Sequence, residues 1–165
     1  MGQRKYKELK EKDISTTIRV FKKYNQLKIT IREYFFMVRI YKLFEDLDAF
    51  IASYDGDKTE SCAGAFMRNL KALKNKNRCI GTIALTYQAL TRPIIIHECT
   101  HAALGYHSII FNDNTDHENI PTSIGINREE EFFCTLISCL CNEILNYAEG
   151  YYRLLMKIKK RMKTY

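Results

Sequence analysis

One short stretch restricts what this chain can fold into and which chemistry it can carry. Residues 94–103 read Ile-Ile-Ile-His-Glu-Cys-Thr-His-Ala-Ala and contain the pattern H-E-x-x-H. On an α-helix, positions i and i+4 lie on one face, so the imidazoles of His97 and His101 can approach the same metal ion. The sequence therefore predicts a helix over residues 91–104 that presents both histidines to a metal, with Glu98 beside them.

These residue types are typical of zinc-dependent hydrolysis. A catalytic zinc ion has tetrahedral geometry and keeps one position for water, which it activates near neutral pH. The Glu98 carboxylate would then act as the general base and pass the proton to the leaving amine. This reading predicts a metallopeptidase with one Zn²⁺ per chain. The simpler alternative is a core helix whose histidines are only hydrogen-bonded, because the rest of the segment is apolar or small.

The ends of this helix also have sequence signals. Thr91 suits an N-cap, and Pro93 suits the first helical turn. Gly105 is a natural C-terminal stop. We therefore expect the helix to end near residue 104 and residues 105–127 to form a long loop.

A catalytic zinc needs a third protein ligand, and His107 is the first candidate. His107 follows His97 by ten residues, which is the spacing of the third histidine in the H-E-x-x-H-x-x-G-x-x-H pattern of metzincins. That pattern has a glycine where this chain has Leu104, and the glycine here comes one residue later. His107 is otherwise a loop histidine near the cleft.

The second candidate is the acidic cluster at residues 129–131, on a second helix, as in gluzincins. Glu130 is favoured by periodicity, because the apolar residues that follow it at helical spacing continue its face into the core. Glu131 is favoured by close packing, because the small residues Cys134 and Ser138 would let two helices approach. A metal ligand must come close, so Glu131 is preferred. Acids in a first turn also stabilise a helix without any other role.

The two helical segments together resemble a known class of protein. Residues 97–103 and then 130–138, Glu-Glu-Phe-Phe-Cys-Thr-Leu-Ile-Ser, look like the H-E-x-x-H-A-A and E-E-x-x-A-Y-L helices of small zinc metallopeptidases encoded by bacteriophages. They are more distantly similar to the gluzincin-type domains of phage-repressor-cleaving peptidases. The similarity spans residues 79–145, and Cys134 stands where alanine is usual.

This resemblance implies a fold and a set of roles. His97, His101 and Glu131 would bind Zn²⁺, and Glu98 would be the general base. The implied fold is an α+β, zincin-like domain, in which a small, mostly antiparallel sheet packs against the metal helix and a long C-terminal helix. The substrate would be a peptide or protein. The oxyanion donor stays open among four side chains: Tyr87, Tyr106, His107 and His117.

Hydrophobic periodicity supports this α+β expectation along the chain. It predicts strands at residues 14–20, 27–31, 35–41, 61–67 and 79–87, and helices at 43–53 and 128–162. By fold analogy, strand 79–87 would form the edge of the cleft, where an extended substrate pairs with it. The chain is expected to be a single domain over residues 1–165, with residues 1–12 frayed and 153–165 forming a basic helical tail.

The charge distribution suggests an alternative function. The net charge is +7 at pH 7, and residues 153–165 carry six Lys and Arg without an acid. Residues 68–78 form a second basic stretch. Such runs are usually solvated, but they also suit nucleic acid or an acidic protein partner. The alternative is therefore a catalytically inactive zincin-like module that binds such a partner through its basic tail.

The cysteines and the apolar segments indicate the compartment. The six cysteines form no C-x-x-C pair and lie within apolar segments, which is typical of free buried thiols in a reducing environment. No apolar run is long enough to span a bilayer, and the N-terminus lacks a signal-peptide core. We therefore expect a cytoplasmic protein, inside a phage-infected host cell by the resemblance above, with no membrane contact.

Overall fold

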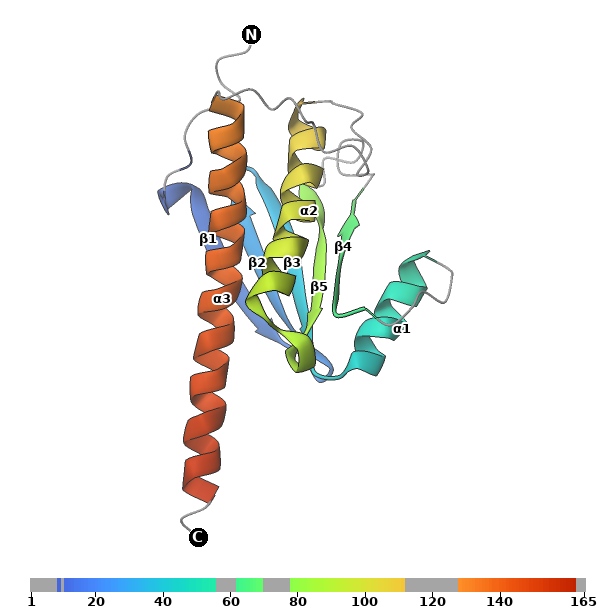
Figure 1. Cartoon of the computed structure of the whole chain (residues 1–165), viewed down its shortest axis with the longest axis vertical. Coiled ribbons are helices and arrows are strands. Elements are labelled where there is room, and N and C mark those ends of the chain that lie inside the picture. Colours follow the sequence, from blue (N-terminus) through green and yellow to red (C-terminus); the bar gives the residue numbers. More distant parts are fainter. Residues whose placement is uncertain (1–8, 10, 56–61, 70–77, 112–127, 163–165) are drawn as a thin grey trace.

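A computed structural model describes residues 9, 11–55, 62–69, 78–111 and 128–162, and it shows an α+β architecture (Figure 1). The strands are β1 (Ile14–Val20), β2 (Tyr24–Ile31), β3 (Tyr34–Tyr41), β4 (Gly64–Arg68) and β5 (Cys79–Thr86). The α-helices are α1 (Phe44–Asp55), α2 (Arg92–Phe111) and α3 (Arg128–Met162), and two short 3₁₀ helices are η2 (Glu11–Asp13) and η3 (Tyr87–Ala89).

The strands form one mostly antiparallel sheet in the order β1-β2-β3-β5-β4. Among the described strands, only β3 and β5 are parallel neighbours. Each predicted strand and helix is present. Strand β2 begins earlier, at Tyr24, within a segment that we expected to be a turn, and β4 begins later, at Gly64 instead of residue 61. The predicted α+β class with a mostly antiparallel sheet and a long C-terminal helix is also confirmed.

The helices cover both faces of the sheet. Helices α2 and α3 lie side by side across one face (Figure 1). There, alternate residues of β2 such as Leu27, Ile29 and Ile31 are fully buried against them. Helix α1 packs on the other face through Leu47 and Ile51. The strand period of two therefore divides the apolar side chains between two cores.

The described residues of the N-terminal segment pack against the rest of the fold. Leu9, which lies within the stretch that we expected to fray, is buried in the larger core. The backbone N–H of Arg32 donates to the carbonyl oxygen of Asp13 at 2.8 Å. These contacts attach η2 to the turn between β2 and β3. Residues 1–8 lie outside the described residues.

The prediction that strand 79–87 forms the edge of the cleft was wrong, because β5 is an interior strand. It lies between β3 and β4, and nearly all of its residues are buried. A continuous apolar strand of this kind is typical of a position covered on both faces. Strand β4 is the edge strand instead, and within the described ranges it pairs only with β5.

The expected end of the metal helix was also wrong. Helix α2 continues through Gly105 to Phe111, and Gly105 is a packing glycine rather than a stop. A Cβ atom there would lie 2.8 Å from the Phe66 ring, and a Cβ atom on Gly81 of β5 would lie 2.7 Å from the same ring. Gly81 and Gly105 thus form a slot that the Phe66 ring fills, and this contact packs β4 against α2.

Two of the helices are long, but neither has the composition of a membrane span. Helix α3 has 35 residues and α2 has 20, but among the residues that the structure describes no helix combines the length and apolar character needed to cross a bilayer.

This slot predicts opposite effects for two glycine substitutions. Gly105→Ala should destabilise the fold by about 1–3 kcal/mol, because the new methyl group overpacks the Phe66 ring. Gly150→Ala, at a helical position where a Cβ atom meets nothing within 4 Å, should stabilise it by up to about 1 kcal/mol. Thermal unfolding measures both. Equal effects of the two substitutions would contradict the slot, whereas partial rescue of Gly105→Ala by Phe66→Leu would support it.

Candidate metal centre

The two histidines of the motif meet on the outward face of α2. His97 is exposed and His101 is half-buried. Their Nε2 atoms are 3.1 Å apart, and their rings lie nearly perpendicular at 77°. The opposite face of the helix carries Ile95, Cys99 and Ala102, which are buried in the core. Burial of that face aims the histidine pair away from the sheet.

This spacing fits one zinc ion. Two nitrogen ligands at about 2.0–2.1 Å from a tetrahedral ion stand about 3.3 Å apart. The observed separation of 3.1 Å is close to that value. The pair can therefore supply two ligands without a large movement of either side chain.

Glu98 lies on the flank of α2 that faces β4. Only 6% of its surface is exposed, and a Cβ atom on Gly64 would lie 3.0 Å from the Glu98 Cγ. Burial raises the pKa of the Glu98 carboxyl, and the charge of His97 opposes this effect. The missing side chain at Gly64 thus makes room for an acid inside the wall of the site.

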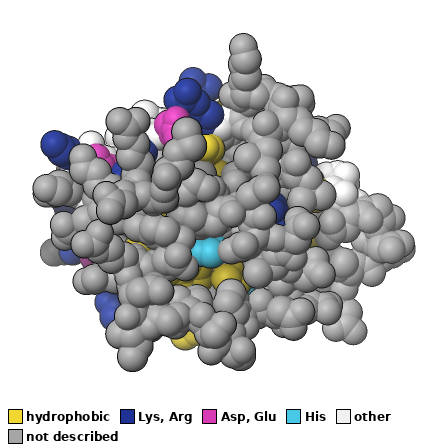
Figure 2. Space-filling model, turned by 90° about the horizontal axis from the view of Figure 1, so that it is seen from above, with side chains coloured by type: hydrophobic (Ala, Val, Ile, Leu, Met, Phe, Trp, Pro, Cys, Tyr) yellow, Lys and Arg dark blue, Asp and Glu magenta, His cyan; other side chains and the backbone are white. Residues whose placement is uncertain are grey.

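These groups line one hollow between β4 and α2. Its volume is about 260 Å³, and its lining comprises Gly64, Ala65, Phe66, His97, Glu98 and His101. Figure 2 views the molecule from above and shows a histidine side chain at the surface next to hydrophobic side chains. The contribution of β4 was missed from the sequence, although the run Gly64-Ala65-Phe66 was correctly predicted to be part of a strand. The signal was the pair of small residues followed by a large ring.

The described residues do not complete a metal site. They include no group of three His, Cys, Asp or Glu side chains able to hold a metal ion. The backbone of Glu131 lies in the first turn of α3, but the side chains of residues 128–131 lie outside the described residues. The third ligand therefore stays a prediction.

The packing argument that favoured Glu131 was wrong. Cys134 and Ser138 are exposed, and the Ser138 hydroxyl donates to the Cys134 carbonyl oxygen at 2.9 Å. Helix α3 instead turns Phe132 and Leu136 into the core. The Phe132 ring lies 6.0 Å from that of Tyr106, so the start of α3 runs beside the part of α2 that follows the histidine pair.

The metzincin alternative is not supported by the course of α2. His107 follows His101 by six residues on the same continuous helix. Six residues advance a helix by about 9 Å and turn it by about 240°. His107 therefore lies on another face of α2, and it does not line the hollow.

Besides His107, two more of the four expected oxyanion donors lie away from the hollow. Tyr106 is buried in the core beside Tyr34 and Phe36, and burial raises its pKa to about 12. The Tyr87 hydroxyl bonds with Asn25 and Tyr147. Neither tyrosine lines the hollow, and His117 lies outside the described residues.

The remaining predictions are partly tested. All six cysteines are free, as expected, but only Cys99 and Cys141 are buried. Cys134 is exposed, and the other three are half-buried. Helix α3 extends well beyond the sheet at its C-terminal end (Figure 1). The side chains of residues 158–165, and residues 70–77 of the second basic stretch, lie outside the described residues. A partner for either basic segment stays a prediction.

Comparisons of this chain with protein-family models, with curated proteins and with solved structures found no match. The interpretation of the site therefore rests on its own geometry and on the motif.

The geometry predicts which side chains hold zinc. The wild type should bind about one zinc per chain. His97→Ala and His101→Ala should each lose it, because each substitution leaves only one histidine ligand for the ion. His107→Ala is the matched control on the same helix and should keep its zinc. Elemental analysis of dialysed protein measures the content. Zinc retained in both His97→Ala and His101→Ala would contradict the assignment.

Proposed function

We propose that this chain is a zincin-like, zinc-dependent peptidase that acts in the hollow between β4 and α2. The observation that carries the proposal is the meeting of His97, His101 and Glu98 with an edge strand in one hollow. Hydrolysis of an extended peptide requires ligands for a metal ion, a general base and a strand edge that can pair with the substrate.

Each side chain has a separate task. His97 and His101 would hold Zn²⁺, and when bound the ion supplies Lewis acidity toward a water molecule and a carbonyl group. Glu98 would take a proton from the attacking water on its carboxylate and then donate it to the leaving amine. Its close fit against Gly64 restricts the carboxylate to one side of the histidine pair.

The edge strand supports a peptide substrate over a small molecule. The outer edge of β4 is not paired with another strand among the described residues. Its backbone can therefore bind an extended chain by β-strand addition. The same strand lines the hollow beside Glu98, so a peptide paired with β4 would pass the proposed base.

The resemblance to phage zinc peptidases supports Glu131 as the third ligand, and a set of substitutions tests it. Glu131→Gln should abolish zinc binding, because glutamine lacks the carboxylate charge. Glu129→Gln and Glu130→Gln are matched controls in the same helical turn and should keep zinc. Loss of zinc in Glu130→Gln alone would assign the ligand to the adjacent glutamate.

Peptide hydrolysis itself is tested with Glu98→Gln. Loss of a general base should lower the cleavage rate of a quenched fluorescent peptide library by about 10²–10⁴-fold, while the zinc content stays unchanged. Glu45→Gln, at an exposed position on α1, is the control for removing one carboxylate and should retain full activity. Wild-type zinc-loaded protein without cleavage, or Glu98→Gln with undiminished cleavage, would contradict the proposed function.

A further inference from the structure

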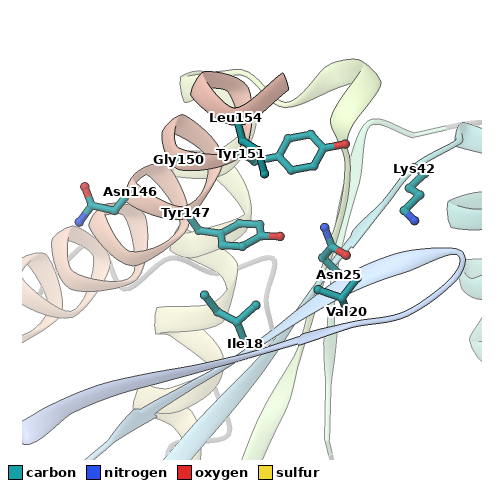
Figure 3. A pocket seen from close by; sticks show the side chains of 9 residues that line it. All are labelled: Ile18, Val20, Asn25, Lys42, Asn146, Tyr147, Gly150, Tyr151 and Leu154. Atoms are coloured by element: carbon teal, nitrogen blue, oxygen red, sulfur yellow. The ribbon is translucent and has the colours of Figure 1, made fainter. Parts of the chain in front are cut away.

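A second cavity lies near the opposite edge of the sheet from the histidine pair. It lies between the β1–β2 hairpin and the second half of α3 (Figure 3), and its volume is about 590 Å³. It shares no lining residue with the hollow that holds the proposed active site. The second cavity is therefore a separate candidate site, and its role does not depend on the proposed function.

The cavity opens where α3 and β1 separate. The Thr16 hydroxyl donates to the Glu143 carboxylate at 2.6 Å, so the helix and the strand are in contact at that level. Farther along both elements, Ile18 is 53%, Val20 is 74% and Leu154 is 56% exposed, and all three line the cavity. Facing apolar side chains thus stay open to solvent on a strand and on a helix. Exposed apolar surface of this kind is typical of a docking site.

The wall on α3 has the residue spacing of a helix-packing seam. Tyr147, Tyr151 and Leu154 follow one another at intervals of four and three residues, which is the a and d spacing by which one helix packs against another. Figure 3 shows the rings of Tyr147 and Tyr151 pointing from α3 toward the hairpin. Earlier in the same register, Leu140 and Ile144 are buried in the core. The seam therefore continues beyond the part of α3 that the sheet covers, and a second helix is the partner that fits it.

A glycine beside this seam supports a close approach of a partner. Gly150 lines the cavity from the interior of α3, where glycine lowers helix stability relative to alanine. A Cβ atom at Gly64, Gly81 or Gly105 would meet a neighbouring atom within 3.0 Å, but at Gly150 it meets nothing within 4 Å. The described part of the fold thus does not explain this glycine. A residue without a side chain next to a seam lets another helix come near.

The charges around the cavity are positive. Lys42 lines the cavity, is exposed and forms no ion pair with any other described residue. Lys157 is exposed and follows Gly150 by seven residues, so it lies on the same side of α3 about two turns later. Residues 153–165 carry six Lys and Arg without an acid. A second copy of this chain would bring like charges together, whereas an acidic partner would complement them.

We propose that the second cavity docks an acidic amphipathic helix of a partner protein. The apolar stripe of that helix packs between Ile18 and Leu154, with its backbone next to Gly150. Aspartate or glutamate residues on its flanks pair with Lys42 and Lys157. The acidic partner expected from the sequence thereby acquires a defined docking surface, of which the basic tail is only one side.

Fluorescence anisotropy with a labelled synthetic peptide tests the partner class. The peptide has about three heptads with leucine at positions a and d and glutamate at e and g, and its control has lysine in place of every glutamate. At low salt the full chain should bind the glutamate peptide at least about tenfold more tightly than the lysine peptide, and added salt should reduce the difference. Equal affinity for the two peptides, or no binding of the glutamate peptide, would overturn the proposal.

Substitutions on the two walls test the location of the docking site. Leu154→Ser and Ile18→Ser should each weaken binding of the glutamate peptide about tenfold, because each removes an apolar contact. Met156→Ser, at a 69% exposed position on the same helix but outside the cavity lining, should keep the wild-type affinity. Lys157→Glu should weaken binding through repulsion. Lys28→Glu is its control, at an exposed position on the opposite face of the hairpin.

Gly150→Leu adds a steric test that separates docking from folding. The new side chain should fill the cavity and weaken the glutamate peptide at least about tenfold. The unfolding temperature should not fall, because leucine is a better helix former than glycine. Undiminished binding in this folded variant would overturn the proposal. Sedimentation with phosphatidylglycerol vesicles, or dimerisation in analytical ultracentrifugation, that is lost in Leu154→Ser would assign the cavity to a membrane or to a second copy instead, and would overturn it as well.

Discussion

The site depends on one packing contact, the insertion of the Phe66 ring between Gly81 and Gly105. Any side chain at either glycine would collide with the ring. The contact draws edge strand β4 against α2, and the hollow that holds His97 and Glu98 is the space between these two elements. Because protein interiors are close-packed, the position of one ring here sets the width of the whole site.

The same close approach explains the environment of Glu98. Gly64 comes before Phe66 on β4 and lies against the Glu98 side chain, so the carboxyl is buried at the edge of the hollow rather than in water. Burial raises the pKa of this carboxyl. The histidines sit on the outward face of the helix and stay accessible. One helix thus presents a buried acid, the exposed imidazole of His97 and the half-buried imidazole of His101 to the same space.

Two tyrosines of α3 bind the helix to η3. The Tyr151 ring stacks on that of Tyr87 at 4.1 Å, and the Tyr152 hydroxyl donates to the Tyr87 carbonyl oxygen at 3.2 Å. Helix α3 is therefore held at η3, and nearer its start Glu143 accepts a hydrogen bond from the Thr16 hydroxyl of β1 at 2.6 Å. The gap that remains next to the β1–β2 hairpin is the second cavity.

The sequence by itself determined the strands, the helices and the histidine pair, because periodicity and the i, i+4 spacing act within one element. Tertiary structure alone decided that β5 is interior, that Gly105 continues a helix and that Cys134 faces outward. The reason is that strand order and helix approach depend on contacts between segments far apart in the chain. Local sequence patterns do not predict which distant side chain, such as Phe66, will fill a given gap.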